Sequence, residues 1–238
     1  MKKIVIAATL ALVSACSTLP DSIKGPFARS SHGATASDAV DQGSTASPYP
    51  AETDQGIFAA PLHAEDDVSQ PVILVAKPEL QDPAYAHTVV VVAPLGGDQH
   101  IGFIVNRPTE VTLGKLFPDD GPSQKVAEPV YLGGPYKPEL IFALVKRATS
   151  PGGKSLAVLP GLYAAVDEKT VDTIIRADAR MARFVAGFVA WQEGELHDEI
   201  EAGAWYVLAP DPQLVLDRPA ESLWQDLVHR SQAAQNAI

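Results

Sequence analysis

The sequence predicts an α+β domain that is built around a mixed sheet. Short apolar runs rich in Val and Ile recur from residue 72 onward, and Pro, Gly and Asp bound them, as is typical of buried strands. Helical periods are fewer and shorter, and they are interspersed among these runs. No segment repeats. Strands in runs with scattered short helices favour an α+β arrangement over a helical bundle or an array of repeats.

Each predicted strand is a run of two to eight mostly apolar residues, and many of these are β-branched or aromatic. The first, at 72–76, reads VILVA, and the second, at 88–93, reads TVVVVA. The full predicted set is 72–76, 88–93, 101–105, 130–131, 141–145, 156–159, 162–166, 184–191, 204–208 and 214–216.

The predicted helices carry apolar residues at helical spacing. In one of them Val171, Ile174 and Ile175 share a face. In another, Leu196 and Ile200 pair at i,i+4 before Gly203, which suits a helix C-terminus. The predicted helical ranges are 112–117, 167–177, 195–202 and 219–232.

The first 15 residues are predicted to be a signal peptide. Lys2 and Lys3 precede an apolar stretch that is shorter than the roughly 20 residues of a membrane-spanning helix. Small residues then lead to Cys16, the single cysteine of the chain, and this ending resembles a bacterial lipobox. That resemblance implies diacylglycerol on the Cys16 thiol and an acylated amine. The alternative is a buried N-terminal element in which the cysteine is incidental.

Residues 16–70 are predicted to be a disordered tether between the lipidated cysteine and the folded domain at 71–238. They are rich in Ser, Ala, Asp, Gly and Pro and have few large apolar residues, so they cannot offset their ordering entropy. The formal net charge of −11 argues against binding to nucleic acid or to anionic lipid, so acyl chains would supply the membrane attachment. Lipidation of Cys16 would leave no thiol for disulfides, catalysis or metal binding.

No catalytic constellation, metal site or cofactor is predicted. Gly153-Lys154-Ser155 resembles the end of a phosphate loop, but Ala148 replaces the required glycine and a strand is predicted to follow. His197 and Glu201 could reach one metal ion from a helix, yet the acidic face of that helix (Glu195, Asp198, Glu199, Glu201) is predicted to be solvated. The three tryptophans are predicted to be core and lid aromatics.

Four blocks of residues together resemble the YqgE/AlgH family, in order and spacing, from about Val72 to Val228. They are 74–89, 102–108, 130–135 and 188–205, and they include Asn106-Arg107-Pro108, Gly133-Gly134-Pro135 and Gly203-Ala204-Trp205. The resemblance implies a bifurcated, largely antiparallel sheet that is curled into a pseudo-barrel with flanking helices. It implies no established activity. The chain departs from the family pattern at Ala190, at 192–195 and at 96–100, and members are generally cytoplasmic.

The motif residues allow two interpretations. In the first, Asn106 bonds its own turn, Pro108 keeps Arg107 extended at a strand end, and Gly133-Gly134 form a tight turn. In the second they share a ligand cleft, in which Arg107 clamps an anion and the Gly133 and Gly134 amides line the floor. The full candidate cleft is Asn106, Arg107, Gly133, Gly134, Trp191 and Glu195.

The sequence therefore predicts a non-catalytic, lipid-anchored envelope protein that binds a protein partner or a small ligand. Its expected location is the periplasmic face of the outer membrane, because Ser17 follows Cys16; the alternative is the cytoplasm. The family label offers a second function, transcriptional regulation, although no direct contact with nucleic acid is expected. A third is a hydrolase that uses Glu195, His197 or Arg107.

Overall fold

A computed structural model of the chain describes residues 68–177 and 179–236. The predicted signal peptide, Cys16 and most of the predicted tether lie outside these residues. Val68 was placed in the tether, yet it is buried, and its carbonyl accepts a 2.8 Å hydrogen bond from Nε2 of His100. Within the described part of the chain, the helices are too short or too polar to cross a bilayer.

Ten strands form a mixed sheet in which every pair except β5 and β9 runs antiparallel. The main order is β10-β1-β2-β3-β9-β6-β8-β7, and β4 and β5 lie off this path. The strands are β1 (Val72–Ala76), β2 (Val89–Gly96), β3 (Gln99–Ile104), β4 (Pro108–Thr112), β5 (Pro129–Leu132), β6 (Tyr136–Lys146), β7 (Ser155–Leu159), β8 (Leu162–Ala165), β9 (Ala182–Trp191) and β10 (Trp205–Leu208).

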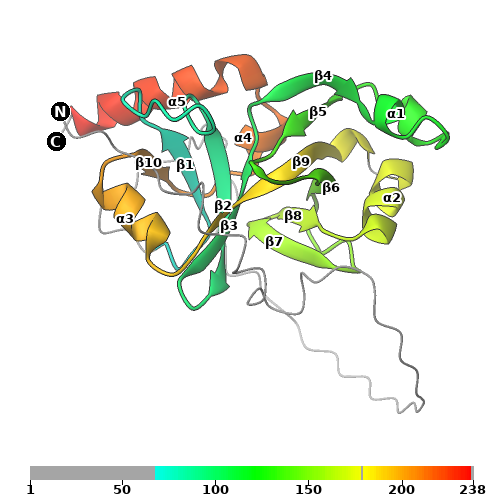
Figure 1. The fold of residues 1–238 in the computed structure, drawn as a ribbon, viewed down its shortest axis with the longest axis horizontal. Helices are drawn as coiled ribbons and strands as arrows, with labels where there is room; N and C mark the ends of the chain where they lie inside the picture. The colour runs from blue at the N-terminus through cyan, green and yellow to red at the C-terminus, as the bar shows by residue number, and fades with distance from the viewer. Residues whose placement is uncertain (1–67, 178, 237–238) are drawn as a thin grey trace, which may run out of the picture.

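The sheet divides along β9, the long yellow strand at the centre of Figure 1. The end of β9 pairs with β3 at 189–191, whereas its middle pairs with β5 at 185–186. Strand β6 follows the other edge of β9. The sheet curls far enough for β7 to lie against β2. This bifurcated, curled sheet with flanking helices confirms the predicted α+β class.

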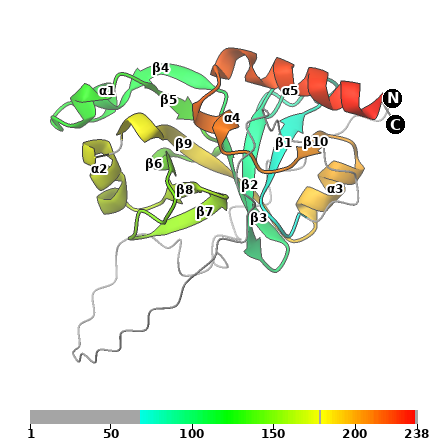
Figure 2. The same ribbon diagram turned by 180° about the vertical axis from the view of Figure 1, so that it is seen from behind.

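Helices cover the sheet on several sides (Figures 1 and 2). The long C-terminal helix α5 lies against β1, α2 packs on β6, and α3 sits beside β10. The helical elements are α1 (Leu113–Leu116), η2 (Ser123–Lys125), α2 (Glu168–Ala177), η3 (Ala179–Met181), α3 (Glu195–Glu201), α4 (Gln213–Leu216) and α5 (Ala220–Gln235).

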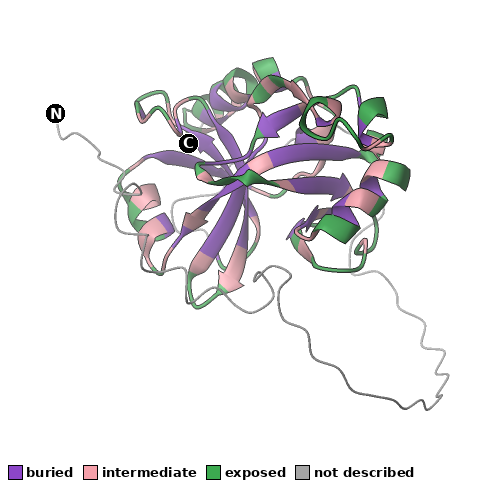
Figure 3. Ribbon diagram, turned by 45° about the vertical axis from the view of Figure 1, so that its right-hand side comes forward, coloured by how far each residue is buried: buried purple, intermediate pink, exposed green. Residues whose placement is uncertain are grey.

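The core follows the central strands, which Figure 3 shows as an almost continuous buried region. Every residue of β1 and the first five of β2 are buried. Both faces of these strands are covered, which explains why their sequences are continuously apolar instead of alternating.

Three local predictions were wrong or incomplete. Residues 214–216 were predicted to be a strand but belong to the helix α4. Pro212 has helical φ just before it, and the Asp211 carboxylate accepts the Gln213 N–H at 2.9 Å, so this turn carries a helix start. Strand β4 and the first half of β6 were missed because their residues are half-buried or exposed and most of them are not apolar.

Candidate functional site

The loop at 82–87, between β1 and β2, gathers contacts from several of the motif residues. Arg107 follows β3 and reaches back to this loop. Its Nη1 donates to the Ala84 carbonyl at 2.8 Å, and its Nη2 donates to Pro83 at 3.2 Å and Ala86 at 2.8 Å. Burial lowers the pKa of the half-buried guanidinium, while the nearby Asp82 opposes that shift. Arg107 is therefore held by main-chain oxygens and fixes the shape of the loop.

Asn106 holds the other end of the same loop. Its Oδ1 accepts the Val89 N–H at 2.8 Å, and its Nδ2 donates to the His87 carbonyl at 2.9 Å. One of the two interpretations had Asn106 bond its own turn, but its side chain bonds the backbone of residues 87 and 89. The amide instead joins the end of β3 to the start of β2, so Asn106 and Arg107 clamp the loop together.

Gly133 and Gly134 lie against the backbone of β9. The Gly133 N–H donates to the Ala186 carbonyl, and the Gly133 carbonyl accepts the Ile104 N–H, each at 2.8 Å. A Cβ on Gly133 would lie 2.5 Å from the Gly187 oxygen, and one on Gly134 would lie 2.2 Å from the Phe188 backbone. Glycine is required here because two chains approach more closely than a side chain allows.

The structure thus places the two halves of the predicted anion cleft in different surroundings. The Arg107 guanidinium faces the carbonyls of the loop, and the Gly133 amide is engaged with β9. They are linked through the backbone, since the Leu132 N–H donates to the Arg107 carbonyl at 2.8 Å. These contacts hold the strands in place where the sheet divides.

Trp191 and Glu195, the other two candidates, lie at a buried aromatic cluster beside α3. The indole N–H of Trp191 and that of Trp205 both donate to Oε2 of Glu199, at 2.9 Å each. Both tryptophans are buried, as predicted for core aromatics. Glu195 closes the turn into α3, because its Oε2 accepts the Gln192 N–H at 2.8 Å.

Two ionisable groups at this cluster, Glu199 and Tyr85, have raised pKa values. Burial raises the pKa of Glu199, the two indole donors oppose that shift, and the Glu195 and Asp82 charges add to it. Burial likewise raises the pKa of Tyr85, which packs edge-on against Trp205 with the ring centroids 6.2 Å apart. A half-buried carboxyl that two indoles hold in place is well suited to joining α3 to β9 and β10.

Glu199 contradicts the prediction of a fully solvated acidic face on α3. His197, Asp198 and Glu201 are exposed, but Glu199 is only partly so. The sequence did hold a usable signal, because Glu199 follows the buried Leu196 by three residues and so shares its face. No sequence pattern, however, indicated that two distant tryptophans would meet one oxygen.

Arg183 is a buried cation that the sequence analysis did not single out. It lies on β9 near the point where the sheet divides, and its Nη1 donates to the Val105 carbonyl at 2.7 Å. Its guanidinium carbon sits 4.3 Å from the ring centroid of Tyr131. Burial lowers its pKa, while Tyr131 and two more distant glutamates oppose that shift. This cation–π contact ties β5 to β9.

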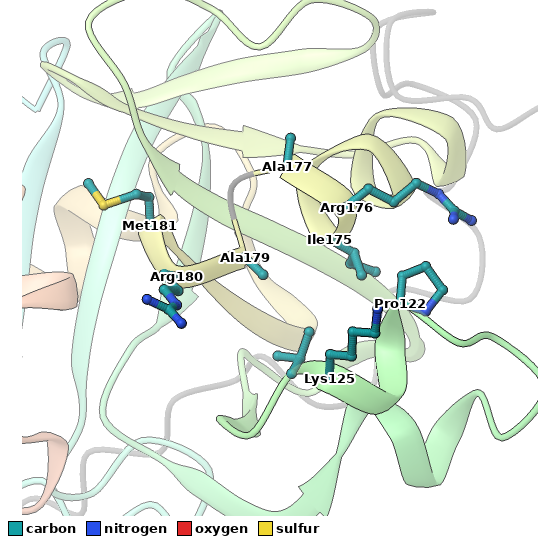
Figure 4. A pocket seen from close by; sticks show the side chains of 9 residues that line it. Pro122, Lys125, Ile175, Arg176, Ala177, Ala179, Arg180 and Met181 are labelled. Atoms are coloured by element: carbon teal, nitrogen blue, oxygen red, sulfur yellow. The ribbon is translucent and has the colours of Figure 1, made fainter.

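A pocket of about 590 Å³ opens between η2 and the α2–η3 segment (Figure 4). We call it the α2–η3 groove. Its apolar lining includes Val126, Ile175, Ala179 and Met181, and its cations are Lys125, Arg176 and Arg180. None of these residues belongs to the blocks that carried the family resemblance, and the sequence singled out none of them as part of a site.

Within residues 68–177 and 179–236, no three His, Cys, Asp or Glu side chains come together in a way that could hold an ion.

The segment that resembles the end of a phosphate loop lies just before β7. The Lys154 N–H donates to the Asp167 carboxylate at 2.9 Å, in the loop ahead of this strand. Gly153 and Lys154 therefore lie in the connection from β6 to β7, and Ser155 begins β7, so no helix follows the glycine as a phosphate loop requires.

Several solved structures resemble this fold. The solution structure of the AlgH protein from Pseudomonas aeruginosa aligns with a TM-score of 0.57 at 24% identity, covering 71% of this chain and 91% of that one. A crystal structure of a protein from Corynebacterium diphtheriae also aligns with a TM-score of 0.57, at 20% identity, covering 69% and 88%. At these identities the likeness establishes the fold alone.

Relatives that are similar in sequence also align with about two thirds of this chain. An uncharacterised UPF0301 protein from Streptomyces avermitilis is 30% identical over 167 residues, covering 66% of this chain and 84% of the relative. A UPF0301 protein from Pseudoalteromonas translucida is 26% identical over 162 residues, covering 65% and 86%. The sequence model of the AlgH-like family, DUF179, matches residues 73–235, which is more than half of the chain. The chain therefore belongs to the AlgH-like family.

Proposed function

We propose that this chain is a lipid-anchored envelope protein whose AlgH-like domain binds a ligand or partner without catalysis. The α2–η3 groove carries the binding part of the proposal. It combines an open volume of about 590 Å³ with apolar side chains and cations in a chain of net charge −11. Concave sites with an apolar lining and a few charged groups are the usual form of ligand sites.

The proposed location rests on the N-terminal sequence. Lys2 and Lys3, the short apolar stretch and the small residues before Cys16 support cleavage and lipidation at that cysteine. Acyl chains would then hold the domain at the membrane, and Ser17 favours the outer membrane facing the periplasm. The long segment before Val68 would give the domain reach from the bilayer.

The non-catalytic part rests on what the candidate side chains already do. The Arg107 guanidinium donates hydrogen bonds to three loop carbonyls, and the Glu199 carboxyl accepts two from indole N–H groups. A catalytic acid or anion clamp needs a group that can face a substrate. These two groups instead support the loop at 82–87 and the helix α3.

The test of the location is the intact mass and membrane fraction of the protein beside a Cys16→Ser variant. We expect a cleaved, acyl-shifted species in the membrane fraction, and we expect the variant to lose both the shift and the attachment. A soluble, uncleaved wild type would overturn the envelope assignment and return the protein to the cytoplasm. Binding by the domain is tested separately, by titration of its groove.

A further inference from the structure

We propose that the α2–η3 groove binds an anionic amphiphile with a single apolar chain. The headgroup would lie between Lys125 and Arg180, and the chain would cover Ile175, Ala179 and Met181. This inference rests on the proposed function, because it takes the groove as the binding site and names the chemistry of its ligand.

The cations of the groove differ in how far they are already neutralised. Arg176 pairs with Asp172 at 2.9 Å and with Asp120 at 3.5 Å, and Figure 4 shows its guanidinium pointing away from Arg180. Within residues 68–177 and 179–236, no carboxylate lies at ion-pair distance from Lys125 or Arg180. Among the described residues, these two cations therefore have no carboxylate partner and can face an anion.

An apolar surface adjoins these cations. The Met181 side chain is 48% exposed and is one of five large apolar side chains that the described residues leave open to solvent. Ile175 and Ala179 of the same lining are half-buried, and Val126 is buried. Water in contact with these groups would be released by an aliphatic chain, which gives a driving force that a purely polar anion lacks.

The size of the groove favours a small amphiphile over a folded partner. Its volume of about 590 Å³ lies within the range of roughly 300–1,000 Å³ that is usual for small-molecule sites. A stable protein partner buries on the order of 800 Å² on each side, mostly outside a pocket of this kind. An acidic peptide is the competing occupant, and the test below separates the two.

Met181 provides a probe inside the groove, because the chain has only two methionines, Met1 and Met181. We would label both with ¹³C at the ε-methyl in full-length protein carrying Cys16→Ser, and record two-dimensional NMR spectra during titration. Decanoate and decyl phosphate, each below its micelle concentration, distinguish carboxylate from phosphate headgroups. Decanol, inorganic phosphate and an acidic peptide serve as comparison ligands.

We expect decanoate or decyl phosphate to shift the Met181 methyl saturably and to bind more weakly at high salt. Lys125→Gln and Arg180→Gln are each expected to weaken binding by about two- to fivefold, as for exposed charge pairs. Lys169→Gln, an exposed lysine of α2 outside the groove, is the matched control and should bind as the wild type does.

Four results would overturn the inference. These are no saturable shift at Met181, equal affinity for decanol, no difference between the groove variants and Lys169→Gln, or tighter binding of the acidic peptide. The proposed location is tested by a different experiment, which compares the intact mass and membrane fraction of the wild type with those of Cys16→Ser. A protein that is membrane-anchored but does not bind decanoate or decyl phosphate loses only the ligand class, whereas a soluble one that binds either loses only the envelope assignment.

Discussion

Replacement of Arg107 by Gln tests whether the most distinctive motif residue supports the fold or binds an anion. The guanidinium makes two hydrogen bonds of 2.8 Å and one of 3.2 Å to the loop at 82–87. A hydrogen bond that involves a charged group contributes about 1.5–3 kcal/mol net, and water can partly replace those at a half-buried site. A Gln amide has only two N–H donors on a shorter side chain, so it cannot keep all three bonds, and we expect a loss of about 2–3 kcal/mol in the free energy of unfolding.

The assay is urea denaturation followed by tryptophan fluorescence, together with thermal melts. A loss of this size should lower the denaturation midpoint at an unchanged m-value, and it should lower Tm by roughly 5–10 °C for a domain of this length. Lys169→Gln is the matched control, because Lys169 is an exposed cation that makes no ion pair with the described residues. Its effect should stay within about 0.5 kcal/mol.

A different pattern would refute this reasoning. If Arg107→Gln unfolds at the wild-type midpoint and loses affinity for a bound anion, Arg107 is a ligand clamp and its contacts with the loop are incidental. Unchanged stability together with unchanged anion affinity would remove both roles. Only a loss of stability at the expected size, with anion affinity unaffected, supports a role in holding the loop.

Three further predictions concern the other candidate residues. Wild-type stability should fall as pH rises from the ordinary carboxyl range to the raised pKa of Glu199, because the folded state holds that proton more tightly than the unfolded state does. In Glu199→Gln the Tm from thermal melts should depend less on pH across this range. An equal dependence of Tm on pH in the two proteins would contradict the prediction. In Gly134→Ala the new Cβ would lie 2.2 Å from the backbone of β9, so the free energy of unfolding should fall by about 3 kcal/mol or more. Gly121→Ala, whose Cβ would meet nothing within 4 Å, should be nearly neutral, and circular dichroism melts of the two variants measure the difference. Asn106→Ala leaves the Val89 N–H without its acceptor and should cost about 1–3 kcal/mol while speeding hydrogen exchange at that amide; unchanged exchange would show that the bond is dispensable.

Local pattern was enough to predict the α+β class and most of the strands. The VILVA run was predicted as 72–76 and forms β1 over those same residues, because a β-branched run bounded by Pro has few other stable conformations. The helix predicted at 167–177 is found at Glu168–Ala177, since its apolar period and acidic start agree. The strand prediction at 214–216 was wrong because three apolar residues are too few to distinguish the helical period from the strand period.

The sequence by itself determined the class of the domain, most of its elements and the motifs that mark the AlgH-like family. Only the tertiary structure decided what the motif side chains do: Arg107 meets the carbonyls of a loop about 20 residues earlier, and two tryptophans meet Glu199. Only the structure brought Lys125 and Arg180 to one groove. The physical reason is that local periodicity sets strand and helix, whereas contacts across the sheet depend on register, curvature and packing among segments far apart in the chain.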